Sequence, residues 1–228
     1  MLFGIGTLLL FVLIFGPQQW TRHILKHYGN NIEGIPGSGG ELAVHLLEKL
    51  EIKDVSVVKT KSGNDHYDPG EKVIRLSPNI YDGKSLTAVT IAAHECGHAM
   101  QHHTGYTPMY LRWHMFRFLA WAEKIGVIVL VSTPIIALVT HSSHLGIATL
   151  VCGIFFLFMP VLFHLLTLPV ELDASFGRAL PILKDGGYLS ESDIPKAKKI
   201  LIAAALTYLS VSLASILNLY RWLIFLRR

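Results

Sequence analysis

Long apolar runs alternate with polar segments along the chain. One apolar run covers residues 2–16, and two more, 125–140 and 145–170, lie on either side of a short polar turn. A fourth extends from residue 200 to about 217. Apolar runs of this kind are typical of membrane-spanning helices. The pattern therefore predicts a mainly α membrane protein with about four transmembrane helices, the middle two forming a helical hairpin.

The polar segment 18–124 is long enough to hold a small folded α+β domain. Leucines at helical spacing predict an amphipathic helix near its start: Leu42, Leu46, Leu47 and Leu50. Residues rich in β-branched side chains predict short strands at 55–60 and 72–76. The second strand could offer an edge to an extended peptide, but its alternation fits core packing equally well. Ser85 is then a cap for a helix that continues to about His103.

The chain thus divides into five parts. They are a first transmembrane helix at 1–17, the polar domain at 18–124, the hairpin at 125–170, a membrane-proximal helix and loop at 171–199, and a fourth transmembrane helix with a tail at 200–228. Three basic residues precede the hairpin: Arg112, Arg117 and Lys124. The two polar segments hold all 16 acidic residues and 17 of the 20 basic ones. Because positive residues favour the cytoplasmic side of a membrane, both segments are expected there.

Composition narrows the class of protein. Of the 228 residues, 51% are hydrophobic and 16% are charged, whereas soluble domains carry about 25% charged residues. This apolar content excludes a disordered chain, and two cysteines, Cys96 and Cys152, give no disulfide framework. The net charge of +4 is modest, and we expect no nucleic-acid partner. Twelve histidines direct attention to a metal site.

The sequence HECGH at 94–98 is the strongest chemical signal in the chain. On a helix, His94 and His98 lie one turn apart and face the same way. Two imidazoles so placed can bind one Zn²⁺ at about 2.0–2.1 Å, while Glu95 between them reaches a water molecule on the metal. Small neighbouring residues such as Ala93 and Gly97 allow close packing behind the metal.

A catalytic zinc needs a third protein ligand and an open position. The metzincin class requires Gly and His where this chain has Gln101 and Thr104, which excludes that class. The other common third ligand is a glutamate on a second helix, and Glu171, at the end of the third apolar run, supplies one. Thr167 can cap a helix and Pro169 is tolerated in a first turn, so Glu171 is expected near the N-terminus of a new helix. Two predicted spans separate it from the histidines, so both parts emerge on the same side of the membrane, as a shared metal requires.

Four runs of residues together resemble a known family. They are HYDP at 66–69, VIRLS at 73–77, HECGHAMQ at 94–101 and PVELDAS at 169–175. With them the chain resembles, from its first predicted span to its last, the neutral zinc metallopeptidases of the YugP-like membrane family. It is more remotely similar to the HtpX heat-shock protease and the CAAX prenyl proteases, which also place membrane spans between the HExxH helix and a helix that carries a glutamate.

The resemblance implies a gluzincin-like site with one Zn²⁺ per chain. It implies three ligands, His94, His98 and Glu171, and Glu95 as the general base. In the HtpX-like group an aspartate four residues after the ligand glutamate supports the site, and this chain has Ser175 there. Ser175 and Asp173 are therefore both candidates for supporting the metal ligands.

Four more residues are candidates for a role around the metal. Arg178 follows Glu171 on the same helical face and could orient it or stabilise an oxyanion, but an anchoring ion pair explains it equally well. His102 shares the face of the two ligand histidines and is either a supporting residue or a surface histidine. His66 and Tyr67 could donate to a tetrahedral intermediate, although packing explains them better.

The sequence thus predicts an integral, multi-pass membrane zinc metalloendopeptidase with its catalytic domain at 18–124 on the cytoplasmic side. Its expected partners are the lipid bilayer and a peptide or protein substrate, with membrane proteins as one candidate class. Two alternatives stay open. One is an intramembrane protease of the site-2 type, and the other is a non-enzymatic membrane protein with a structural zinc site.

Overall fold

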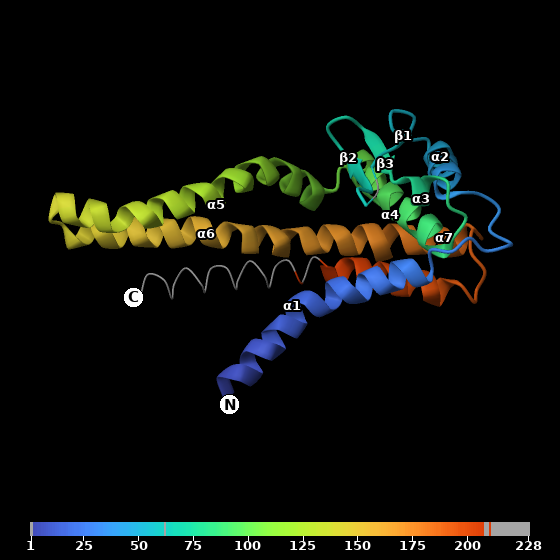
Figure 1. The fold of residues 1–228 in the computed structure, drawn as a ribbon. Helices are drawn as coiled ribbons and strands as arrows, with labels where there is room; N and C mark the ends of the chain where they lie inside the picture. Colours follow the sequence, from blue (N-terminus) through green and yellow to red (C-terminus); the bar gives the residue numbers. More distant parts are fainter. Residues whose placement is uncertain (1, 62, 208–209, 211–228) are drawn as a thin grey trace.

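The computed structural model describes residues 2–61, 63–207 and 210, which are mainly helical and include one small sheet (Figure 1). Its elements are, in chain order, α1 (Leu2–His27), α2 (Gly39–Lys49), β1 (Ser56–Lys59), β2 (His66–Asp68), β3 (Val73–Leu76), α3 (Pro78–Tyr81), α4 (Leu86–His103), α5 (Thr107–Thr140), α6 (Ser143–Leu172), the π-helix η1 (Asp173–Ala179) and α7 (Leu180–Asp185). A further helix covers 194–207.

The helices α2 and α4 pack against each other and form the core of the polar domain. A capping box fixes the start of α2, because the Ser38 hydroxyl accepts the Glu41 N–H and the Glu41 carboxylate accepts the Ser38 N–H. The start of α4 is fixed by the Ser85 hydroxyl, which accepts the Ala88 N–H at 3.1 Å. The structure confirms both helices that the sequence predicts here.

The three strands form one sheet in the order β1-β3-β2. β1 pairs with β3 in parallel, and β2 pairs with β3 antiparallel. The strands predicted at 55–60 and 72–76 are confirmed as β1 and β3. Of the two interpretations of the second strand, the edge for a peptide is wrong, since β3 lies in the middle of the sheet, and its buried side chains agree with core packing. The sequence did not reveal β2 because three residues are too few to show an alternating pattern. The edge strands of the described sheet are therefore β1 and β2.

The helices α5 and α6 lie side by side as a long hairpin that extends away from the sheet (Figure 1). His141 adopts a left-handed conformation at the turn (φ 49°), and the Ser142 hydroxyl accepts the Leu145 N–H. Many large apolar side chains of the hairpin are exposed, including Trp121 (63%), Ile128 (67%) and Leu138 (73%). The hairpin thus presents an apolar surface that the rest of the described chain does not cover.

The expectation of about four transmembrane helices is wrong for the residues described above. Among them one helical stretch, Ser143–Asp185, is long and apolar enough to cross a membrane, and Lys124–Thr140 is a shorter apolar stretch. The physical reason is length: at about 1.5 Å per residue, the runs 2–16 and 125–140 extend roughly 22 and 24 Å, less than the ~30 Å hydrocarbon core. The run predicted at 200–217 lies mostly outside the described residues.

Helix α4 also lies against η1, and their backbones approach closely at Gly97. A Cβ atom on Gly97 would lie 2.6 Å from the carbonyl oxygen of Ala174. The partner atom belongs to the backbone and cannot rotate away, so a side chain at this position would force α4 and η1 apart. Glycine at 97 therefore sets the spacing between these two helices.

We expect Gly97→Ala to destabilise the protein by about 1–3 kcal/mol because the added methyl group overpacks the contact between α4 and η1. The midpoint of thermal unfolding of the detergent-solubilised protein measures the effect. Gly16→Ala is the matched control, since a Cβ there meets only Val12 at an ordinary 3.8 Å. An unfolding midpoint of Gly97→Ala at or above that of the wild type would contradict the proposed role of the close approach.

Candidate metal centre

Three side chains with metal-binding atoms converge where α4 meets the end of α6. His94 and His98 come from successive turns of α4, with ring centroids 4.7 Å apart. Glu171 lies in the last turn of α6, and its Oε2 is 3.2 Å from Nε2 of His94 and 3.4 Å from Nε2 of His98. All three potential ligand atoms lie within 4.8 Å of one another. The structure thus brings together the two histidines and the distant glutamate that the sequence singles out.

Glu171 reaches this position differently from the sequence expectation. The helix α6 continues through Pro169 without a break, and the chain then passes into η1. Glu171 is therefore near the C-terminal end of α6, and the prediction of a new helix N-terminus there is wrong. A proline ring inside a long helix removes one backbone hydrogen bond but does not end the helix when neighbouring helices hold it.

The carboxylate of Glu171 is fully buried, and its two oxygens have different surroundings. Oε1 accepts a hydrogen bond from Nη1 of Arg112 at 2.6 Å. Oε2 has no hydrogen-bond partner among the described residues, although both imidazole nitrogens lie close to it. A buried carboxylate oxygen without a partner is costly, so this oxygen marks a place where a positively charged group would be stabilised.

The protonation of His98 follows from its contact with Gln101. The amide nitrogen of Gln101 donates to the Val170 carbonyl oxygen and to Oδ2 of Asp173, both at 2.8 Å. Its amide oxygen therefore faces Nδ1 of His98 at 2.9 Å and must accept the proton from that nitrogen. In the neutral imidazole, Nε2 then carries a lone pair and points it toward Oε2 of Glu171.

His94 is supported in the same way by Ser175, whose Oγ lies 3.0 Å from Nδ1 of the imidazole. The hydroxyl can accept the Nδ1 proton, which leaves Nε2 of His94 free as a lone-pair donor. Two imidazole lone pairs and one carboxylate oxygen thus converge on one point, and none of the three has a proton to offer the others. This donor set fits Zn²⁺, which takes nitrogen and oxygen ligands of this kind.

Two backbone features, at Gly97 and in η1, bring side chains close enough to hydrogen-bond the histidines or their partners. Gly97 lets α4 approach η1 closely enough for Ser175 to contact His94 and for Gln101 to contact Asp173. The π-helical hydrogen bonding of η1, which is rare and is found frequently at functional sites, begins two residues after Glu171. The same short segment therefore carries a supporting group for each of the two histidines.

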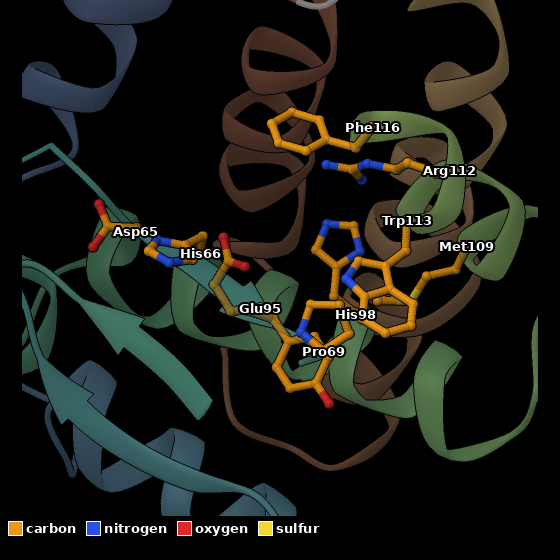
Figure 2. Close-up of a pocket in the computed structure, with 10 residues that line it drawn as sticks. Asp65, His66, Pro69, Glu95, His98, Met109, Arg112, Trp113 and Phe116 are labelled. Carbon is orange, nitrogen blue, oxygen red and sulfur yellow. The ribbon is translucent and has the colours of Figure 1, made fainter. Parts of the chain in front are cut away.

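A cavity of about 180 Å³ opens beside these side chains, between the edge strand β2 and the start of α5 (Figure 2). Its lining comes from three regions: Asp65, His66, Tyr67 and Pro69 in and beside β2, Glu95 and His98 on α4, and Met109, Arg112, Trp113 and Phe116 on α5. The cavity has both polar and apolar walls and is large enough for several water molecules or one side chain.

Glu95 lies on the wall of this cavity, next to His94 in the chain. Its side chain is buried, and burial raises the pKa of its carboxyl to about 7, with the charge of Glu171 adding to the increase and that of His94 opposing it. A carboxyl with a pKa near neutrality can both accept and return a proton at physiological pH.

Among the remaining candidate residues, Arg178 is paired with Asp173 and not with Glu171. Its Nε donates to Oδ2 of Asp173 at 2.8 Å, and its guanidinium lies over the ring of Tyr106. Because Asp173 also accepts from Gln101, Arg178 is connected to His98 through two intermediate side chains.

The other three candidates lie around β2. Nδ1 of His66 is hydrogen-bonded to the Asn64 carbonyl oxygen at 2.9 Å, and its ring lies on the cavity wall near Glu95 (Figure 2). The hydroxyl of Tyr67 is hydrogen-bonded to Nδ1 of His102 at 2.7 Å. Burial lowers the pKa of His102 and raises that of Tyr67, so both side chains favour their neutral forms. His102 is not among the three clustered ligand side chains.

Sequence reasoning missed two residues that touch the cluster, Gln101 and Arg112. Gln101 lies three residues after His98 on the buried face of α4. Because a buried amide needs hydrogen-bond partners, this position could have indicated a contact with a neighbouring side chain. Arg112 stood out only as one of several basic residues before an apolar run. Its contact with Glu171 spans 59 residues of sequence, and no local pattern indicates it.

Comparisons with known proteins identify the family of this chain. The sequence model of the family described as "Putative neutral zinc metallopeptidase" matches residues 3–227. The chain is 34% identical over 225 residues to the "Putative membrane protease YugP" of Bacillus subtilis (strain 168), an alignment that covers 97% of this chain and 95% of the relative. No solved structure matches the chain with comparable significance. The resemblance seen in the four sequence motifs is thereby confirmed, and the chain belongs to the neutral zinc metallopeptidase family.

Proposed function

We propose that this protein is a zinc metalloendopeptidase whose single zinc ion is held by His94, His98 and Glu171. The observation that carries the proposal is the buried Oε2 of Glu171, which faces the Nε2 atoms of both histidines and has no hydrogen bond among the described residues. The membership of the chain in a zinc metallopeptidase family supports the same metal. Three protein ligands beside an open cavity are typical of catalytic zinc sites, whereas structural sites are closed by four.

Bound in this position, Zn²⁺ would supply Lewis-acid chemistry, since it polarises a peptide carbonyl group and makes a water molecule more acidic. The residues of the chain supply the proton transfers. Glu95 is the general base: its carboxylate takes a proton from the attacking water and returns it to the leaving amine. Its position on the cavity wall and its raised pKa support this role.

The cavity also suggests how a peptide would bind. One edge of β2 pairs with β3, and in the described sheet its other edge has no strand beside it. Residues of β2 form one wall of the cavity, so an extended peptide could pair with this edge while its side chains meet Trp113 and Phe116 on the opposite wall. An endopeptidase needs such a site because it must hold a chain on both sides of the bond that it cleaves.

We further propose that the α5–α6 hairpin enters the lipid bilayer. Its exposed apolar side chains support this location, as do the apolar stretch Ser143–Asp185 and the name of the Bacillus subtilis relative, "Putative membrane protease YugP". Trp121 and Lys124, which contact each other near the middle of α5, are residue types that favour the membrane interface. The charge distribution favours a catalytic domain on the cytoplasmic side. A catalytic domain held at the membrane in this way could act on substrates that include membrane proteins.

The ligand set predicts how zinc content responds to substitution. Detergent-purified wild-type protein should contain about one zinc per chain, and His94→Ala, His98→Ala and Glu171→Ala should each lose most of it, because each removes one of three protein ligands. Elemental analysis of the purified proteins measures the metal content. His103→Gln is the control, because His103 is exposed on the same helix and is not one of the three clustered side chains. Full zinc retention by Glu171→Ala would contradict the assignment of the third ligand.

The proposed base predicts a separation of metal binding from catalysis. Glu95→Gln should retain wild-type zinc content but lose hydrolysis by at least about 100-fold, since the amide keeps the shape of the carboxyl and cannot accept the proton. Cleavage of an unfolded protein such as casein by the detergent-solubilised enzyme measures the rate. A Glu95→Gln protein that cleaves at the wild-type rate would rule out Glu95 as the base.

The contact between Gln101 and His98 predicts a weaker site in Gln101→Leu. Leucine has a similar volume but cannot accept the Nδ1 proton, so the imidazole loses the hydrogen bond that orients it. We expect zinc affinity to fall by about 10–100-fold, measured by competition with a chelator. His103→Gln is again the control, and an unchanged affinity in Gln101→Leu would show that this hydrogen bond does not tune the metal site.

A further inference from the structure

The geometry of Arg112 bears on how Glu171 is held. Glu171 is fully buried, and a buried carboxylate is stable only when charge and hydrogen bonds compensate it. Arg112 supplies both, since its Nη1 lies 2.6 Å from Oε1. The other oxygen, Oε2, is thereby left directed at the two histidines. The arginine thus distinguishes two oxygens that are chemically equivalent in a free carboxylate.

Arg112 approaches from a different element than any of the three proposed ligands. It lies in the second turn of α5, and Figure 2 shows its guanidinium extended across the cavity above His98. The start of α5 is held independently, because Met109 is buried in the core of the polar domain. Farther along, Leu119, Ala122 and Met159 pack α5 against α6. The ion pair is therefore not needed to hold α5 in place.

We propose that Arg112 is a positioning residue of the metal centre: it binds Oε1 of Glu171 and so keeps Oε2 directed at Nε2 of His94 and His98. The inference rests on the proposed function, in which Glu171 is a zinc ligand. A planar guanidinium suits this task because its N–H groups are fixed in one plane and it stays charged at every physiological pH. The first turns of the hairpin are then part of the metal centre.

Zinc affinity of the full-length, detergent-solubilised protein tests the role of Arg112. We expect Arg112→Gln to weaken zinc binding by about 10–100-fold, measured by competition with a chelator, and to change the visible absorption spectrum of the Co²⁺-substituted protein, because the glutamate oxygen is no longer fixed. Arg112→Lys should lie between the wild type and Arg112→Gln, since it keeps the charge but not the planar group. Lys124→Gln removes one positive charge from the same helix, far from the cluster, and should behave like the wild type.

A double substitution separates positioning from general stability. In a Glu171→Gln background, adding Arg112→Gln should cause little further loss of zinc affinity, because the carboxylate that Arg112 holds is already gone. Full additivity of the two effects would overturn the inference, as would wild-type zinc affinity and an unchanged Co²⁺ spectrum in Arg112→Gln. If Arg112→Gln does not fold, Arg112→Lys decides, and wild-type affinity in that variant overturns the inference.

Failure of the proposed function would look different. A wild-type protein that binds no zinc, or a Glu171→Ala protein with wild-type zinc affinity, would remove the ligand set on which the role of Arg112 depends, and would overturn both. Loss of zinc in Glu171→Ala together with wild-type affinity in the Arg112 variants would overturn only the positioning role and leave the proposed metal centre intact.

Discussion

The carboxylate of Glu171 is buried where three helices meet, and its position constrains the elements around it. Helix α6 carries it, α4 presents two imidazoles to Oε2, and α5 supplies the arginine for Oε1. An isolated charge in such a place would be strongly destabilising. The three helices must therefore keep the arginine and the two imidazoles close to this carboxylate. The polar domain and the hairpin are consequently not independent, because both contribute side chains to the same charged centre.

Local patterns in the sequence predicted the parts of this site that are local in the structure. His94, Glu95 and His98 are fixed by helical spacing within five residues. The leucine spacing predicted α2, and the Ser85 cap predicted the start of α4. Glu171 was found by excluding another class and by counting apolar runs, although the expected break in its helix is absent. The number of membrane spans was overestimated because apolar character was easier to recognise in the sequence than sufficient length.

The remaining contacts could not be predicted because they join residues far apart in sequence. Arg112 and Glu171 are separated by 59 residues, and the amide of Gln101 donates to atoms 69 and 72 residues away. The strand β2 was missed for a related reason: its three residues gain their strand conformation from pairing with β3 and not from their own pattern. Such features depend on tertiary packing, which a single sequence does not display.

The two glutamates at the centre show how surroundings, and not residue type, assign chemical roles. Glu171 has one oxygen held by Arg112 and the other enclosed by two imidazoles, so it has no freedom to carry a proton to or from a substrate. Glu95 is one residue from a proposed ligand, yet it lies on the cavity wall, and its carboxyl has a pKa of about 7 because burial disfavours its charge. A group that holds a metal should be fixed and charged, whereas a group that exchanges protons with a substrate should face the cavity and have a pKa close to neutrality. The positions of these two side chains satisfy those opposite requirements at one centre, which is why the proposal assigns binding to Glu171 and proton transfer to Glu95.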